Sequence, residues 1–354
     1  MKLFTDSSMK KTPERRRYLF AVAAGLIYGL SLRLIFHGPH LIGTPHSPPY
    51  RSFFYPDDLW VMTAGFLVVV PFVMGWIAIT GTTSDEKFRW AHWIFAPWLA
   101  VLLSDLCVLF AGLEGWICII FAIPITLAIS SIGGITAGLL GRNRLLKGRS
   151  TTACLAMLPF LLAGIEMQLN APLEIRTVQT SILIHAPASR VWGNIERVPP
   201  ISPSEIPPTW THRIGFPLPV EATLDHEGIG GIRHASFQGG LLFIETIDLW
   251  IPGQTIGFKI AADTAHIPLT TLDEHVTIGG RYFDVLNGEY RLEPLPDGDI
   301  LLHLSSQERL STDFNAYAAL WSDAVMRDLQ QSILQVVKKR CETDSHSTSA
   351  TLNP

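Results

Sequence analysis

Three residues able to do acid-base or metal chemistry stand side by side at Asp225, His226 and Glu227. They stand where one segment with the alternating pattern of a β-strand, 220–226, ends and before a second such segment, 231–237, begins. Neighbouring residues of a strand point to opposite faces, so the three side chains cannot all converge on one substrate or metal. We interpret the triplet as the solvated end of a hairpin.

Further polar residues occur inside the expected strands, where alternate side chains share one face. We take four of them as candidates to contact a bound ligand: His234, Asp284, Tyr290 and Glu308. No GxSxG, HExxH or CxxC motif and no phosphate-binding glycine loop accompanies them. We therefore assign no catalytic residue and expect no cofactor.

Histidines and cysteines give no metal or disulfide pattern. His37, His40 and His46 share a proline-rich loop, but no cysteine or carboxylate cluster stands at ligand spacing beside them, so we expect no metal site. Only Cys341 belongs to the polar half of the chain, which excludes a disulfide framework there.

The elements that must position these residues fall into two halves. From Tyr18 to Leu169 charged residues are mostly confined to short loops between apolar runs, whereas after Pro172 they recur every few residues. The first half contains apolar segments about as long as the ~20 residues that cross a bilayer. We predict five transmembrane helices, at 18–36, 59–80, 91–110, 116–140 and 151–169. A cleaved signal peptide is the rival for the first segment, but it leaves the other strong spans unexplained. The fifth is the weakest, because it contains Pro159 and Glu166.

Lysine and arginine predict the orientation, since positively charged loops stay in the cytoplasm. These residues gather before the first segment, between the second and third, and between the fourth and fifth. We therefore expect residues 1–17 to be cytoplasmic and the C-terminal half to be extracytoplasmic. An interfacial fifth segment would reverse the side of the C-terminal half.

Three ionisable residues lie within the expected spans: Arg33, Asp105 and Glu166. Each costs ~2.5 to 3.5 kcal/mol if it faces lipid at mid-bilayer. All three come late in helices that run outward, which predicts similar depths and suggests that Arg33 pairs with Asp105 or Glu166. The alternative is that each reaches the interface by itself.

Ser130, Gly134 and Gly138 repeat at four-residue spacing in the fourth segment. Such a stripe allows close helix packing. Packing within the bundle is our preferred interpretation, and dimerisation is the alternative.

The C-terminal half reads as an α+β domain over 176–342, followed by a polar tail at 343–354 that we expect to be disordered. A strand at 177–184 and a short helix precede a Pro-rich passage at 199–219. Successive strands without intervening helices then predict an antiparallel sheet. The last element is a helix at 315–341, whose apolar stripe includes Trp321 and Val325. Both are candidates to line a ligand cavity.

The C-terminal half has an opening run, TVQTSILIHAPASRVWGNIERV, and a closing run, GEYRLEPLPDGDILLHLSSQERLS, which is followed by a long helix through Trp321. In these runs it resembles START-like helix-grip domains of the SRPBCC superfamily, which includes polyketide cyclase/dehydrase and lipid-transport proteins. The resemblance covers 176–342 and none of the membrane half. It implies a curved antiparallel sheet around the C-terminal helix, with a cavity for an apolar or amphipathic ligand. The long Pro-rich passage at 199–219 departs from the family pattern. We expect it to form either a lid or a rim loop.

These observations predict a membrane-anchored module that binds or transfers a hydrophobic ligand such as a lipid. Its expected partners are the lipid bilayer and that ligand. A net charge of −4 without a basic face excludes nucleic acid. Two alternatives stay open: a cyclase/dehydrase-type enzyme using Asp284 with His234 or Tyr290, and a sensor or scaffold whose membrane half carries the function.

Overall fold

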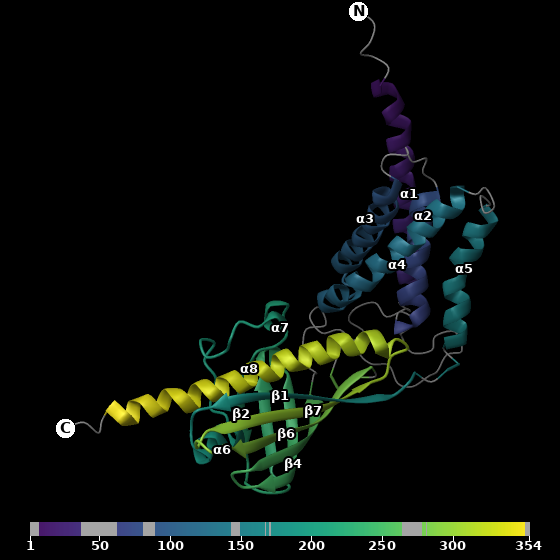
Figure 1. Cartoon of the computed structure of the whole chain (residues 1–354). Helices are drawn as coiled ribbons and strands as arrows, with labels where there is room; N and C mark the ends of the chain where they lie inside the picture. Colours follow the sequence, from purple (N-terminus) through teal and green to yellow (C-terminus); the bar gives the residue numbers. More distant parts are fainter. Residues whose placement is uncertain are drawn as a thin grey trace, which may run out of the picture. The chain divides into compact units, whose positions relative to one another are not determined.

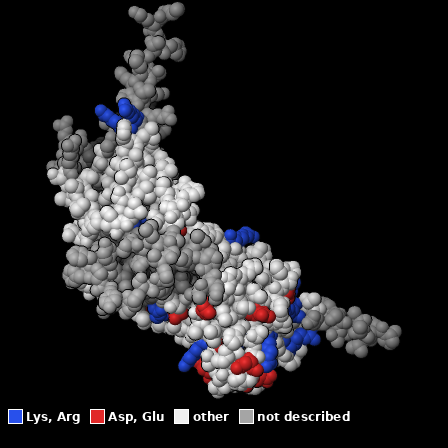
Figure 2. All heavy atoms as spheres, turned by 180° about the vertical axis from the view of Figure 1, so that it is seen from behind, with Lys and Arg blue, Asp and Glu red and all other residues white. Residues whose placement is uncertain are grey.

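The computed structural model describes residues 7–36, 62–80, 89–142, 149–166, 168–169, 171–263, 278–280 and 282–350. The chain divides into two compact units, Met1–Ala171 and Pro172–Pro354. The first unit is helical, and the second is an antiparallel sheet with helices (Figure 1). Figure 2 shows the described surface of the helical unit as mostly uncharged atoms, whereas acidic and basic side chains are scattered over the second unit. This contrast matches the charge distribution of the sequence.

The helical unit consists of α1 (Ser7–Phe36), η2 (Gly65–Val69) running into α2 (Val70–Thr80), α3 (Arg89–Phe110), α4 (Trp116–Arg142) and α5 (Arg149–Glu166). In the described residues, three helices are long and apolar enough to cross a membrane, at Arg16–Ile35, Trp90–Phe110 and Trp116–Leu140. The segments Gly65–Thr80 and Ser150–Glu166 are apolar but shorter than the ~20 residues of a full crossing. The structure thus supports three of the five expected spans, and residues 59–61 lie outside the described residues.

The small-residue stripe of α4 packs inside this unit. A Cβ atom at Gly134 would lie 2.2 Å from the carbonyl oxygen of Trp93, and one at Gly138 would meet the Trp93 ring at 2.3 Å. On α2, a Cβ at Gly75 would lie 1.9 Å from the carbonyl oxygen of Ser130. The glycines therefore permit backbone contacts among α2, α3 and α4, as our preferred interpretation of the stripe requires.

The charged residues of the helical unit have partners that the sequence did not suggest. Arg33 Nη2 lies 2.6 Å from Oε1 of Glu114; the Arg33 side chain is buried, and the Glu114 side chain is 11% exposed. The Glu166 carboxylate accepts hydrogen bonds from the backbone N–H of Gly65 at 3.0 and 3.2 Å. Asp105 lies half-buried on α3. The pairing of Arg33 with Asp105 or Glu166 stays a prediction.

Within its described residues the second unit has seven strands: β1 (Glu174–Ile184), β2 (Pro219–Leu224), β3 (Ile232–Phe237), β4 (Leu242–Ile251), β5 (Thr255–Asp263), β6 (Phe283–Pro294) and β7 (Ile300–Leu310). Their order in the sheet is β1-β7-β6-β5-β4-β3-β2, with every pair antiparallel. Short helices α6 (Ala188–Glu196) and α7 (Trp210–Arg213) follow β1. The expected antiparallel sheet is confirmed.

Helix α8 (Asn315–Ala350) closes the chain and packs against β1 and β7. Together with the sheet it forms the helix-grip arrangement. The core between them includes the buried residues Ile184, Val191, Leu302 and Leu334. The helix continues through Ala350, past residue 343, where the sequence predicted the start of a polar tail.

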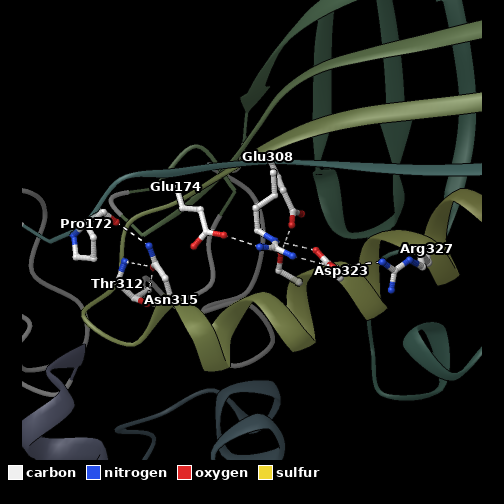
Figure 3. A network of polar contacts seen from close by, with 9 residues as sticks. Pro172, Glu174, Glu308, Thr312, Asn315, Asp323 and Arg327 are labelled. Carbon is white, nitrogen blue, oxygen red and sulfur yellow. Dashed lines mark hydrogen bonds and ion pairs between the residues drawn. The ribbon is translucent and has the colours of Figure 1, made fainter.

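Polar contacts fix the first residues of this unit to α8 (Figure 3). The side-chain amide of Asn315 donates to the carbonyl oxygen of Pro172 at 2.7 Å, and its own oxygen accepts from the Thr312 N–H at 2.8 Å. Arg176 on β1 bonds to Asp323 on α8. Strand β1 is therefore held to the N-terminal half of the helix by side chains as well as by its ladder with β7.

Candidate functional site: a cavity between sheet and helix

A cavity of about 180 Å³ lies between the sheet and helix α8. Its wall is predominantly apolar and includes Phe243, Phe258, Val325 and Leu329. The inward faces of the strands and one side of α8 both contribute, because a curved sheet cannot contact a straight helix along its whole length. An apolar hollow with a few polar groups is the usual form of a small-molecule site.

Arg233 and Glu245 form a buried ion pair in this wall. They are direct cross-strand partners on β3 and β4, and their side chains are 5% and 6% exposed. The guanidinium carbon of Arg233 also lies 5.5 Å from the ring centre of Phe258. Burial raises the pKa of the Glu245 carboxyl, whereas the adjacent Arg233 acts to lower it. A buried charge pair of this kind costs desolvation energy, so its presence in an apolar cavity is a functional signal.

Tyr290 on β6 lies beside the pair and lines the same cavity. Burial raises the pKa of its hydroxyl to about 12, so the group keeps its proton at neutral pH. Nε of Arg233 has no hydrogen-bond partner within the part of the chain that the structure describes. The polar patch of the cavity, which we define as Arg233, Glu245 and Tyr290, thus offers donors to a ligand.

The Pro-rich segment forms another part of the wall through Ile201, His212 and Phe216. It is fastened to α8, because Asp328 accepts hydrogen bonds from the Thr211 N–H at 3.0 Å and hydroxyl at 2.6 Å. Arg340 likewise bonds to the Glu205 carboxylate at 2.6 and 3.1 Å. The segment expected as a lid or rim loop is therefore part of the cavity wall.

His212 presents an imidazole to the cavity from this segment. Its Nδ1 lies 3.0 Å from the Thr209 hydroxyl, and its buried Nε2 has no partner among the described residues. Burial lowers the pKa of His212, which keeps the ring neutral at neutral pH. The ring can therefore accept or donate one hydrogen bond to a ligand, depending on its tautomer.

The structure distributes the six candidates from the sequence over several environments. Val325 and Tyr290 line the cavity. His234 is exposed on the opposite face of β3 from Arg233 and Ala235, and it does not line this cavity.

Asp284 does not line the cavity either, although it has the same parity as Tyr290. A β-bulge between Val285 and Asn287 adds a residue to β6 and reverses the alternation, so Val285 faces inward in its place. The predicted combination of Asp284 with His234 is thus not assembled at this cavity.

Glu308 and Trp321 lie outside the cavity lining formed by the described residues. Glu308 faces inward on β7, is fully buried and accepts a hydrogen bond from the hydroxyl of Ser322 (Figure 3). Burial raises its pKa. Trp321 is half-buried on α8, one residue before Ser322. Glu308 therefore lies at the helix–sheet contact.

Sequence reasoning missed Arg233, Glu245 and His212. The first two carried a usable signal, because they stand at equal distances on either side of Gly239, in the turn between two expected strands. Opposite charges at such positions become cross-strand neighbours when the hairpin forms. His212 carried no such signal, since it lies in a passage without regular periodicity.

No protein-family model matches the sequence, and no curated protein matches it significantly. Among solved structures, the chain is similar to the Zhui aromatase/cyclase from Streptomyces sp. R1128, with 18% identity over 49% of this chain and 98% of that one and a TM-score of 0.32. It is also similar to truncated norcoclaurine synthase from Thalictrum flavum, with 10% identity over 48% and 96% and a TM-score of 0.30. A third similar structure is an uncharacterized protein from Rhizobium leguminosarum, with 13% identity over 48% and 99% and a TM-score of 0.29. These are likenesses of fold over about half of the chain.

Proposed function

We propose that the C-terminal unit binds a small, mainly apolar molecule in the cavity and that the helical unit holds the protein in a membrane. The observation that carries the first part is the apolar cavity of about 180 Å³ with its polar patch of Arg233, Glu245 and Tyr290. The second part is supported by three helices long and apolar enough to span a bilayer, counted over the described residues.

The cavity volume bears on the size of this ligand. An apolar cavity of roughly 150 Å³ accommodates benzene. A cavity of about 180 Å³ therefore suits a molecule of one or two rings better than a two-chain lipid, whose acyl chains need a far larger volume. We take a compact apolar molecule as the ligand class, within the broader expectation of a hydrophobic ligand.

A cavity-filling variant tests the binding function. Ala235 lines the cavity, whereas its neighbour His234 is exposed on the other face of the same strand. The full chain in lipid nanodiscs should bind 2-ethylnaphthalene in equilibrium dialysis, and Ala235→Trp should abolish the saturable part. His234→Trp is the matched control and should bind like the wild type. If the wild type and both variants took up the probe equally, the uptake would be partitioning into lipid, and the proposal would be overturned.

We propose further that the N-terminus is cytoplasmic and the C-terminal unit extracytoplasmic, because Lys and Arg cluster on one side of the expected spans. Pro296 is exposed in the turn between β6 and β7 and offers a labelling position. A cysteine introduced by Pro296→Cys should react with a membrane-impermeant maleimide in intact cells. Labelling only after cell lysis would place this unit in the cytoplasm.

An enzyme is the second candidate, favoured by one observation. His212 and Tyr290 place a neutral imidazole and a protonated hydroxyl on the same cavity, which is the combination that general acid-base catalysis uses. His212→Asn and Tyr290→Phe would each remove turnover while leaving the probe bound. Unchanged turnover of a substrate in both variants would overturn the assignment of His212 and Tyr290 as the acid-base pair.

A further inference from the structure

The polar patch contains a buried ion pair, Arg233 with Glu245, which binding of a purely apolar ligand would not require. Counted over the whole residue, Arg233 and Glu245 are each 4% exposed, so both charged groups are shielded from water. A well-packed apolar pair in their place would be equally or more stable in many proteins. Their presence beside a cavity therefore points to a role in ligand selection.

Arg233 still has donor capacity. A guanidinium carries five N–H donors, and Glu245 accepts through Oε2. Nε of Arg233 is buried without an acceptor among the described residues. A buried donor left without a partner carries a desolvation penalty, which a ligand oxygen beside the guanidinium would relieve.

The charges around Arg233 limit which kind of ligand oxygen can accept a hydrogen bond from its guanidinium. Glu245 already neutralises the guanidinium, and Glu221 adds a second carboxylate to the cavity lining. A ligand carboxylate would bring a further negative charge close to these two in a site of low polarity. An uncharged carbonyl oxygen accepts the same hydrogen bond without that repulsion.

We propose that the cavity selects an uncharged, compact apolar molecule bearing a carbonyl-type oxygen, which accepts a hydrogen bond from the Arg233 guanidinium, while Glu245 excludes anionic analogues. This inference rests on the proposed binding function and names the ligand class. Phe258, over whose face the guanidinium lies, provides an aromatic surface next to the carbonyl position.

Three probes of one shape test the selection: 2-acetylnaphthalene with a neutral carbonyl, 2-ethylnaphthalene without an acceptor, and 2-naphthoate with a carboxylate. Binding is measured by equilibrium dialysis with the full chain in nanodiscs, and the Ala235→Trp variant supplies the partitioning background. The ketone should bind about tenfold more tightly than the hydrocarbon, as a hydrogen bond from a charged donor implies. The carboxylate should bind most weakly.

Two variants separate the roles of the pair. In Glu245→Gln the guanidinium loses its counter-charge, so 2-naphthoate should become the preferred probe. In the double variant Arg233→Met and Glu245→Met no buried charge is left unpaired, so the fold is preserved while the preference for the ketone disappears. Glu227→Gln, which alters an exposed ion pair with Arg197, is the control and should keep the wild-type order.

The outcomes distinguish this inference from the proposed function. If no probe binds saturably to the wild type, the binding function itself fails. If 2-ethylnaphthalene binds as tightly as the ketone, or if the double variant keeps the ketone preference, the cavity binds ligands but Arg233 does not select them. A wild type that prefers 2-naphthoate would likewise overturn the role of Glu245.

Discussion

Arg176 and Asp323 are joined by two parallel hydrogen bonds, from Nε to Oδ1 and from Nη2 to Oδ2, each 2.9 Å long (Figure 3). These two hydrogen bonds connect the beginning of β1 to α8, two elements that are far apart in the sequence. Bidentate pairs of arginine and carboxylate have well-defined geometry and are stronger than simple ion pairs. This contact therefore helps to set the position of the helix across the sheet, on which the cavity depends.

Asp323→Asn should loosen β1. The Arg176–Asp323 pair is partly exposed, so we expect the free energy needed to open β1 for hydrogen exchange to fall by about 1 kcal/mol. Arg176 holds the pKa of Asp323 below its ordinary value of 3.8. The stabilisation is therefore fully present above pH 3.8 and is lost as the pH falls through the lowered pKa. Hydrogen exchange of the β1 amides measures both effects, and a difference that persists after full acidification would contradict the assignment.

Glu308→Gln should stabilise the second unit at neutral pH. Burial raises the folded-state pKa of Glu308 above its ordinary value of 4.5, so the folded state loses stability as the pH rises from 4.5 through the raised pKa. Glutamine stays uncharged and still accepts the hydrogen bond from Ser322. We expect a gain on the order of 1 kcal/mol at neutral pH and little difference below 4.5 in thermal unfolding. A variant less stable than the wild type at neutral pH would show that the charged form is the favoured one.

His212 should make stability depend on mild acidity. Because its folded-state pKa is lowered, the unfolded chain takes up a proton first as the pH falls below 6.5, and the folded state loses stability from there down to the lowered pKa. His212→Asn should flatten this part of the pH profile of the melting temperature. His234→Asn, on the exposed face of β3, should leave it in place. An unchanged profile in His212→Asn would contradict the lowered pKa of His212 in the folded state.

Gly134→Ala should destabilise the helical unit, because the added Cβ would lie 2.2 Å from the Trp93 carbonyl oxygen and 2.7 Å from Cγ of Pro97. Overpacking of this kind costs roughly 1 to 3 kcal/mol. Gly164→Ala on α5 is the matched control, since nothing lies within 4 Å of its added Cβ. Thermal aggregation of the detergent-solubilised chain compares the two. Equal stability would mean that α3 and α4 are farther apart than the structure has them.

Features that depend on local residue pattern could be predicted from the sequence. Long apolar runs identify α1, α3 and α4, and alternation followed by an amphipathic stripe identifies the antiparallel sheet and the helix that crosses it. Val325 and Tyr290 were assigned to the cavity on the same basis, because a stripe or an alternation fixes which face a side chain shares.

Which polar residues meet depends on contacts between distant segments, and the sequence pattern did not reveal them. The bulge in β6 reverses the side of the sheet on which Asp284 lies, and the register of β3 with β4 brings Arg233 to Glu245. His212 reaches the cavity because Asp328 on α8 binds its neighbour Thr211, more than a hundred residues away in the chain. Bulges, registers and long-range hydrogen bonds are set by the packing of distant segments, and a single-residue shift moves a side chain to the other face of a sheet.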